Sequence, residues 1–271
     1  MIVDAHAHAC GEYVTADAIK QKLRSCGCDK VILTPGQNGS RTTYALKNKA
    51  QMHPYEDVVT KQNRSNKMMM GLLGMIRTVP KGNECVYELV KQYPESVYQN
   101  YWVTKKNVDK LDEDYKRMQF VAVKLHQCWE NFSVGDAYFE KVTSWATKQN
   151  LPLFIHMYSH EEVEKMVQYK KSHPQLKLIM GHLYGAELFT KEAQTACENV
   201  YFDLSNCYFV SKERFLLAYQ ALGAEHFLLG SDTPYGRQAL EKTMEQIKTS
   251  GIPEEDIQKI CGENAVKLFA L

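Results

Sequence analysis

Side chains that can bind a metal ion lie close together at the start of the chain. The segment Ile2–His8 carries Asp4, His6 and His8 at every second position. Because successive side chains of a β-strand point to opposite faces, we expect these three to share one face and the two imidazoles to converge. A His-x-His pair alone is a weak signal, since strand histidines more often make local hydrogen bonds. Its meaning depends on the rest of the chain.

Further metal-binding side chains follow other apolar segments. His156 ends one such segment, His182 follows the next, and Asp232 follows the last. Three histidines and a carboxylate suit a divalent transition metal, above all zinc, with manganese as the alternative. Four other histidines lack such a position and are interpreted as surface or structural residues: His53, His160, His173 and His226.

Short β-branched or apolar segments alternate with polar segments of helical spacing, a pattern typical of βα units around a parallel sheet. Eight strands are predicted: Ile2–His6, Lys30–Thr34, Val97–Trp102, Phe120–Leu125, Leu151–His156, Leu176–Gly181, Val200–Leu204 and His226–Gly230. Barrels of about 250 residues form one domain, so residues 1–271 are expected to be a single α/β domain, a (β/α)8 TIM barrel. The active sites of such barrels lie at the carboxyl ends of the strands, where the histidines and Asp232 are expected.

One connection is much longer than the others. Residues 36–71 follow the second predicted strand, whereas βα connections usually contain about 2–6 residues. This position predicts a lid over the carboxyl-terminal face of the barrel. The alternative is a surface insertion with short helices and no part in catalysis.

Composition excludes several classes of function. The net charge of the 271-residue chain is +1, so it offers no basic surface for nucleic acid. No apolar stretch approaches the roughly 18 residues that would span a membrane, and the first residues do not resemble a signal peptide. The eight cysteines lack the spacing of a redox or zinc motif, so free and mostly buried thiols are expected. A cytoplasmic protein with a small-molecule substrate fits these features.

The order of the motifs is more specific than any one of them. From the amino terminus they are HxH, Lys, His, GHLxG, FDLS, GSDTP and GENAVKLF. This order resembles the amidohydrolase superfamily, and most closely its amidohydrolase-related branch of metal-dependent (β/α)8-barrel enzymes. The resemblance covers nearly the whole chain. It implies that His6, His8, His156 and Asp232 bind a metal ion and that His182 acts beside it on water or substrate.

Lys124 has two interpretations. It shares a strand face with Ala122 and His126, so it should point into the barrel, and a buried lysine needs a reason. In binuclear members of the superfamily a carbamylated lysine at this place bridges two metal ions, which would make His182 a ligand. In mononuclear members the lysine is free to bind a substrate carboxylate, and a single ion is favoured here. His126 is either a support for the site or an ordinary residue of the barrel mouth.

Several further residues are weaker candidates. Asp203 and Ser205 share a face, and Asp203 could orient a ligand histidine or Lys124. Asp4 is interpreted either as an orienting group or as the partner of a basic residue inside the barrel. Four loop residues are expected near the mouth, where packing or solvent exposure is their simplest role: Trp129, Tyr184, Tyr235 and Arg237.

The predicted activity is hydrolysis of an amide, lactone or ester, since a divalent ion activates water and polarises a carbonyl. Asp232 would accept the proton, His182 would stabilise the oxyanion or protonate the leaving group, and Lys124 would supply positive charge.

Three alternatives are kept. The first is non-oxidative decarboxylation of an aromatic or unsaturated carboxylate, and the second is a non-catalytic metal-binding barrel. A TatD-like nuclease fits poorly, because that family has a glutamate at the position of Lys124. An assembly of identical subunits is compatible with such barrels, although no residue specifies one.

Overall fold

The fold is an eight-stranded parallel barrel, as the strand pattern predicts. The computed structural model describes residues 1–271 except 38, 74–78 and 193–195. Each strand pairs in parallel with the next one along the chain, in the order β1 to β8. The strands are β1 (Val3–His8), β2 (Lys30–Thr34), β3 (Val97–Trp102), β4 (Ala122–His126), β5 (Leu153–His156), β6 (Leu178–Met180), β7 (Val200–Asp203) and β8 (Phe227–Leu228). All eight predicted strands are therefore confirmed, with small differences at their ends.

The residues that follow β8 close the barrel against β1. The backbone N–H of Ala5 donates to the Leu229 carbonyl over 2.9 Å, and the N–H groups of Ser231 and Asp232 donate to the His6 carbonyl over 3.1 and 2.8 Å. These bonds bring the end of the last strand next to the first. Closure thus places Asp232 beside the His-x-His segment.

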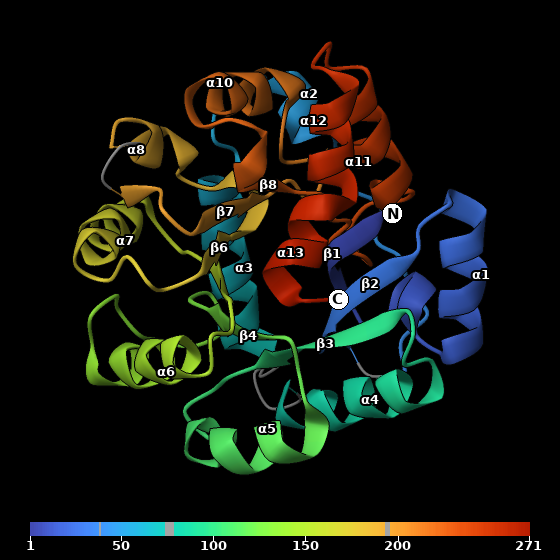
Figure 1. The fold of residues 1–271 in the computed structure, drawn as a ribbon, viewed down its shortest axis with the longest axis vertical. Coiled ribbons are helices and arrows are strands. Elements are labelled where there is room, and N and C mark those ends of the chain that lie inside the picture. The colour runs from blue at the N-terminus through green and yellow to red at the C-terminus, as the bar shows by residue number, and fades with distance from the viewer. Residues whose placement is uncertain (38, 74–78, 193–195) are drawn as a thin grey trace.

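Helices surround the strands (Figure 1). They are α1 (Ala16–Cys26), α2 (Lys49–Met52), α3 (Val59–Leu73), α4 (Val79–Gln92), α5 (Leu111–Met118), α6 (Ala137–Lys148), α7 (His160–Ser172), α8 (Ala186–Thr190), α10 (Lys212–Leu222), α11 (Ala239–Lys248), α12 (Glu254–Gln258) and α13 (Asn264–Phe269). Serine side chains cap two of these helices: the hydroxyls of Ser159 and Ser211 accept from the N–H groups of Glu162 and Arg214 at the starts of α7 and α10.

The barrel interior is apolar at one end and polar at the other. At the amino-terminal end Val3, Ala5, Ile32 and Phe154 form a buried cluster, which the apolar residues of α13 cover. A second and larger cluster fills the layer between the strands and the outer helices. Because apolar packing fills the lower interior, the functional side chains are confined to the carboxyl ends of the strands.

The expectation that Asp4, His6 and His8 share a face is wrong for Asp4. Asp4 pairs with Val31 and Ala7 with Leu33, so β1 contains one residue more than β2 between these pairs, which is a β-bulge. The extra residue reverses the alternation. His6 and His8 point into the barrel, whereas Asp4 points outward.

Outside the barrel, the Asp4 carboxylate accepts hydrogen bonds from the Tyr13 hydroxyl over 3.0 Å and from the Ser231 N–H over 2.9 Å. The same carboxylate accepts from the backbone N–H of His6 over 3.4 Å, so Asp4 contacts the main chain of this histidine but not its ring. The other expectation, a basic partner inside the barrel, is wrong. The contacts of Asp4 instead hold α1 and the β8–β1 junction to the strand.

Asp4 should make the stability of the protein depend on pH. Burial raises the pKa of its carboxyl from 3.8 to about 7. Its protonation therefore favours the folded state at low pH, and this contribution is lost as pH rises from about 4 to 7. Each unit of difference between the pKa in the folded state and the pKa in the unfolded state corresponds to about 1.4 kcal/mol in the free energy of unfolding.

Asp4→Asn should remove this dependence, so wild type should lose stability relative to Asp4→Asn as pH rises. Denaturant unfolding of both proteins between pH 4 and 8, in the presence of a chelator, measures the difference. Asp17→Asn, which changes an exposed carboxylate, is the matched control. A difference between wild type and Asp4→Asn that stays constant with pH would contradict the assignment.

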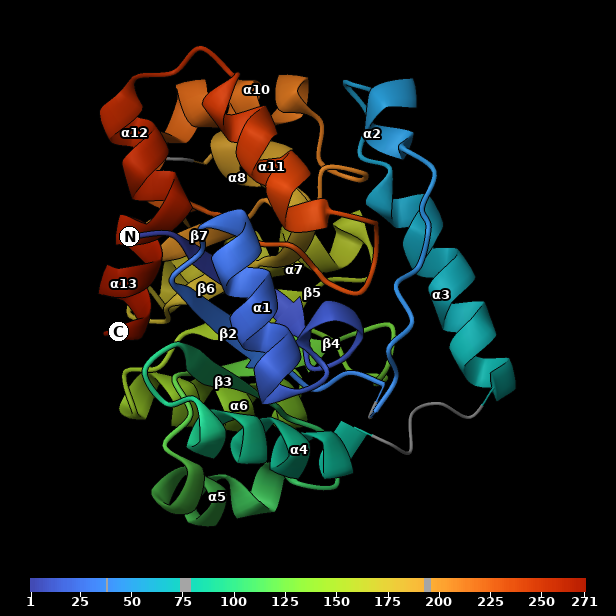
Figure 2. The ribbon, with the colours of Figure 1, turned by 90° about the vertical axis from the view of Figure 1, so that its right-hand side faces the viewer.

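The long connection 36–71 contains α2 and most of α3, and Figure 2 shows these two helices along one side of the barrel, apart from the outer helices. The side chain of Asp57, just before α3, is only 6% exposed and attaches this segment to the barrel. Its carboxylate accepts from the N–H of Gly185 over 3.4 Å and lies 3.1 Å from His160 Nε2 and 3.5 Å from Arg214 Nη2. The segment is therefore fixed to loops that follow the strands, which is the side expected from the sequence.

Two expectations about composition can be compared with the structure. Within the described ranges, no helix combines the length and the apolar character that crossing a membrane requires. All eight cysteines are free; Cys26 is half-buried, Cys85 is exposed, and the other six are buried.

Candidate metal centre

Three predicted ligands converge at the carboxyl end of β1. The ligand atoms of His6, His8 and Asp232 all lie within 4.8 Å of one another, and all three residues are buried. Asp232 Oδ1 is 3.4 Å from His8 Nε2 and 3.7 Å from His6 Nε2. The barrel thus joins residues from opposite ends of the sequence into one group.

The outer nitrogens of both imidazoles have fixed partners. His8 Nδ1 lies 2.7 Å from the Pro35 carbonyl, which can only accept, so Nδ1 carries the proton. His6 Nδ1 lies 2.8 Å from the Asp203 carboxylate and 2.9 Å from the Ser205 hydroxyl, which itself donates to Asp203. Both histidines therefore present an unprotonated Nε2 to the interior. Asp203 therefore lies beside His6, one of the predicted ligands.

His182 and His156 form a second part of the centre. His182 Nδ1 donates to the Ser205 carbonyl over 2.6 Å, so the lone pair of the neutral ring is on Nε2. That nitrogen lies 3.1 Å from His156 Nδ1. On the other side of the His156 ring, Nε2 lies 2.6 Å from the side-chain oxygen of Asn63, which comes from α3. Asn63 was not among the predicted residues.

The electrostatics of this arrangement favour a cation. Burial and the charge of Lys124 lower the pKa of His6 and His8, so both imidazoles are neutral near pH 7. Burial would raise the pKa of Asp232, but His182, His8 and His6 lower it, and the carboxylate is ionised. Lone pairs and a negative charge thus face one another in a buried space. Such a donor set is unfavourable without a positive charge and fits a divalent metal ion.

The spacing of these atoms also fits a metal ion. A tetrahedral zinc ion about 2.0–2.1 Å from each ligand keeps those ligand atoms about 3.3–3.4 Å apart. The separations of 3.4 Å between His8 Nε2 and Asp232 Oδ1 and of 3.7 Å between His6 Nε2 and Asp232 Oδ1 are near this value. His6, His8 and Asp232 therefore fit a divalent ion, whereas the other predicted ligand, His156, is grouped with His126 and Cys128 and not with these three.

Lys124 points into the barrel, as expected. Its Nζ donates to His6 Nε2 over 2.9 Å and lies 5.1 and 4.8 Å from the ring centres of Trp102 and Phe154. Burial lowers its pKa to about 8, although Asp232 and Asp203 raise it. Lys124 and a metal ion would use the same lone pair of His6, so the hydrogen bond and metal binding at that nitrogen exclude each other.

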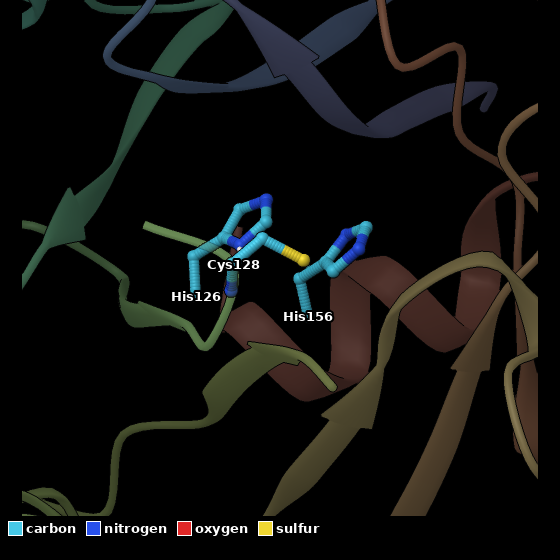
Figure 3. A group of neighbouring side chains, drawn as sticks. All are labelled: His126, Cys128 and His156. Carbon is cyan, nitrogen blue, oxygen red and sulfur yellow. Dashed lines mark hydrogen bonds between the residues drawn. The ribbon is translucent and has the colours of Figure 1, made fainter. Parts of the chain in front are cut away.

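A third group of possible ligand atoms consists of His126, Cys128 and His156 (Figure 3). The His126 and His156 rings are stacked, with centres 4.0 Å apart and planes within 10°. Nitrogen lone pairs lie in the ring planes, so two parallel rings cannot both point at one ion. Burial also raises the pKa of the Cys128 thiol to about 12, which keeps it protonated. This group packs His156 rather than binding a metal.

Aromatic side chains surround the mouth of the barrel. Trp102 stacks on His126 at 5.5 Å and meets Trp129 edge to face at 5.5 Å. Tyr235 packs edge to face on His8 at 5.9 Å and stacks on Tyr44 at 5.6 Å. Tyr184 is buried, with its hydroxyl 2.9 Å from that of Thr60, and Arg237 is exposed. No motif in the sequence had singled out Trp102, which ends β3.

A closed parallel barrel with histidine and carboxylate side chains at its carboxyl-terminal end defines the class of metal-dependent barrel enzymes. The family model described as Amidohydrolase matches residues 3–271, so the chain belongs to the amidohydrolase family. This match confirms the resemblance that the motif order indicates. Among curated proteins, none matches the chain.

Solved structures share the fold at low identity. The chain superimposes on 2,6-dihydroxybenzoate decarboxylase from Rhizobium with a TM-score of 0.70 and 14% identity, covering 99% of this chain and 98% of that one. A manganese-containing dihydroxybenzoic acid decarboxylase from Polaromonas superimposes with a TM-score of 0.67 and 14% identity, covering 100% of this chain and 97% of that one. 4-Oxalomesaconate hydratase from Rhodopseudomonas palustris superimposes with a TM-score of 0.66 and 14% identity, covering 100% of this chain and 96% of that one. At this identity the likeness shows the fold alone.

Asp203 should affect metal affinity without binding the ion. Asp203→Asn replaces a carboxylate that accepts from His6 Nδ1 with an amide, which weakens the basicity and orientation of His6. Loss of such a partner lowers metal affinity by about 10–100-fold. Competition with a chromophoric chelator measures the affinity.

The control is Asp17→Asn, which changes an exposed carboxylate of α1 and should leave metal affinity unchanged. If Asp203→Asn bound metal as tightly as wild type, Asp203 would have no part in the centre.

Proposed function

We propose that this protein is a metal-dependent hydrolase that acts on an amide, lactone or ester carbon of a small molecule. The observation that supports this proposal is the ionised, buried Asp232 beside two histidines whose lone pairs face the same space. When bound by His6, His8, His156 and Asp232, a divalent ion lowers the pKa of water and polarises a carbonyl. Zinc suits the nitrogen-rich donor set, with manganese as the alternative.

Asp232 is the proton acceptor in this proposal. The bond from its N–H to the His6 carbonyl fixes its main chain, and its lowered pKa keeps the carboxylate ionised, so that it can accept a proton from water. In hydrolysis the oxygen of that water forms a bond to the carbonyl carbon, and the bond from carbon to the leaving nitrogen or oxygen breaks. The proton taken by Asp232 is then available to the leaving group.

His182 and Lys124 would act on the substrate. Because His182 Nδ1 is bound to the Ser205 carbonyl, Nε2 is the atom at which His182 can bind or release a proton. Lys124 is buried and is the basic side chain that touches the ligand histidines, so it can balance an oxyanion or hold a substrate carboxylate. A single metal ion is favoured, with Lys124 as a free amine against Trp102 and Phe154. The carbamylated, binuclear form is the alternative.

Decarboxylation of an aromatic carboxylate is the second candidate. The wall formed by Trp102, Trp129 and Tyr235 could stack a planar ring, and Lys124 could bind its carboxylate. Two of the structures that share the fold are named as decarboxylases of dihydroxybenzoates. A non-catalytic barrel is a third candidate, which no particular observation favours.

We also propose that the segment 36–71 is a lid.

Labelled water separates these reactions. The protein is incubated in oxygen-18 water with lactones, aryl esters, N-acyl amides and hydroxybenzoates, and the products are analysed by mass spectrometry. We expect a carboxylate product that contains oxygen-18. We also expect kcat/KM to fall by about 100-fold or more in Asp232→Ala, since a general base usually contributes about 10²–10⁴-fold.

Glu161→Gln, which changes an exposed carboxylate of α7, is the control and should keep full activity. Carbon dioxide released without label in the product would identify a decarboxylase. Metal bound without turnover of any substrate class would favour the non-catalytic barrel.

A further inference from the structure

The polar side chain of Asn63, on helix α3, is buried against the end of β5. Asn63 is fully buried, whereas its neighbour Arg64 is exposed. A buried amide is unfavourable unless its donors and acceptor are all paired. The Asn63 amide nitrogen donates to the carbonyls of Met157 and Tyr158 over 2.8 and 3.1 Å, and its oxygen lies 2.6 Å from His156 Nε2. Every strong hydrogen-bonding atom of this side chain contacts the end of β5 and the loop that follows.

These contacts determine which nitrogen of His156 carries the proton. The two carbonyls can only accept, so they fix the amide nitrogen of Asn63 on their side and its oxygen on the side of His156. The oxygen can only accept, and His156 Nε2 must therefore be the donor. Nδ1 of His156 is left unprotonated, facing His182 Nε2 at 3.1 Å. An amide in the opposite orientation would place an N–H against the ring and two carbonyls against an oxygen.

We propose that Asn63 is a positioning residue of the metal centre, which selects the His156 tautomer whose Nδ1 can bind the ion. This inference rests on the proposed function, because it assigns a task to a residue beside the proposed site. A neutral imidazole offers one lone pair, and its second nitrogen needs an acceptor to fix the tautomer. Ligand histidines commonly donate to a carboxylate or a backbone carbonyl; here a side-chain amide of the long insertion has that position.

The same contact couples the insertion to the metal centre. Thr60, one turn before Asn63, lies 2.9 Å from the Tyr184 hydroxyl, and Asp57 is bound to the Gly185 N–H. Together these bonds hold the start of α3 against the loops after β5 and β6. If α3 leaves this position, His156 loses its acceptor, and its ring can rotate or change tautomer. Docking of the insertion and tight binding of the ion should therefore favour each other.

Nuclear magnetic resonance of metal-free protein tests the tautomer directly. Ring nitrogen shifts of ¹⁵N-histidine-labelled wild type should show His156 protonated at Nε2. Asn63→Leu, which keeps the size and removes the acceptor, should give a mixture of tautomers. Asn63→Asp, as a neutral acid whose O–H donates to one of the two carbonyls, keeps an acceptor oxygen for His156 and should restore protonation at Nε2. Protonation at Nδ1 in wild type would overturn the proposal, whether or not the variants fold.

Metal affinity is the second readout, measured with zinc alone in competition with a chelator. Asn63→Leu should bind zinc about 10–100-fold more weakly than wild type, and Asn63→Asp should recover most of the loss. The matched control is Lys61→Gln, which changes an exposed side chain of the same helix and should leave the His156 tautomer and the zinc affinity unchanged. Equal zinc affinity in Asn63→Leu and wild type would overturn the proposal.

The two readouts separate this inference from the proposed function. If wild type bound no zinc, yet Asn63→Leu changed the His156 tautomer, Asn63 would still position His156 and the metal-dependent function would be wrong. If zinc bound to wild type and to Asn63→Leu alike with the tautomer unchanged, the function would stand and the role of Asn63 would not.

Discussion

The candidate metal centre depends on which ring nitrogen of each histidine carries the hydrogen. His6, His8 and His182 each give one ring hydrogen to an acceptor outside the centre, namely a carboxylate, a backbone carbonyl and a second backbone carbonyl. Their remaining lone pairs then face the interior together with the Asp232 carboxylate. In a buried space such atoms repel one another unless a cation lies among them. The fold can contain this arrangement because the packed barrel holds the strand ends in place.

Several features of the surrounding structure keep these lone pairs and the Asp232 carboxylate facing the same interior space. The bulge in β1 turns Asp4 outward and keeps His6 and His8 inward, so the negative charge of Asp4 does not add to the interior. Closure of β8 on β1 places Asp232 beside them. The stacking of His126 on His156 limits the positions of the latter ring. Lys124 supplies a positive charge in the same space, and its lowered pKa reflects the energetic cost of keeping that charge buried.

Sequence periodicity could predict the barrel and which side chains lie at the carboxyl ends of its strands, but not the details of contact. Strand alternation and position at strand ends identified His6, His8, Lys124, His156 and Asp232, because a parallel barrel gathers strand ends whatever the loops do. The same rule of alternation predicted the wrong face for Asp4. A β-bulge arises because one strand has an extra residue relative to its neighbour, and no residue of Ile2–His8 indicates this.

Asn63 could not be predicted for a different reason. It lies in an irregular segment whose position is decided by tertiary contacts, among them those of Asp57 and Thr60. Only the length of the segment and its place after the second strand indicated that it would lie near the site. The acceptors of the imidazoles are equally hidden from the sequence when they are backbone carbonyls, such as that of Pro35.

The most direct test of this account is elemental analysis of the purified protein, with the metal counted per chain for wild type and for Lys124→Ala. The account predicts about one divalent ion per chain in both proteins, as a single mononuclear centre requires. Absence of metal from wild type, even after incubation with zinc or manganese, would contradict the central claim that the converging lone pairs hold a cation. Two ions in wild type that fall to one or none in Lys124→Ala would instead show a bridged binuclear centre.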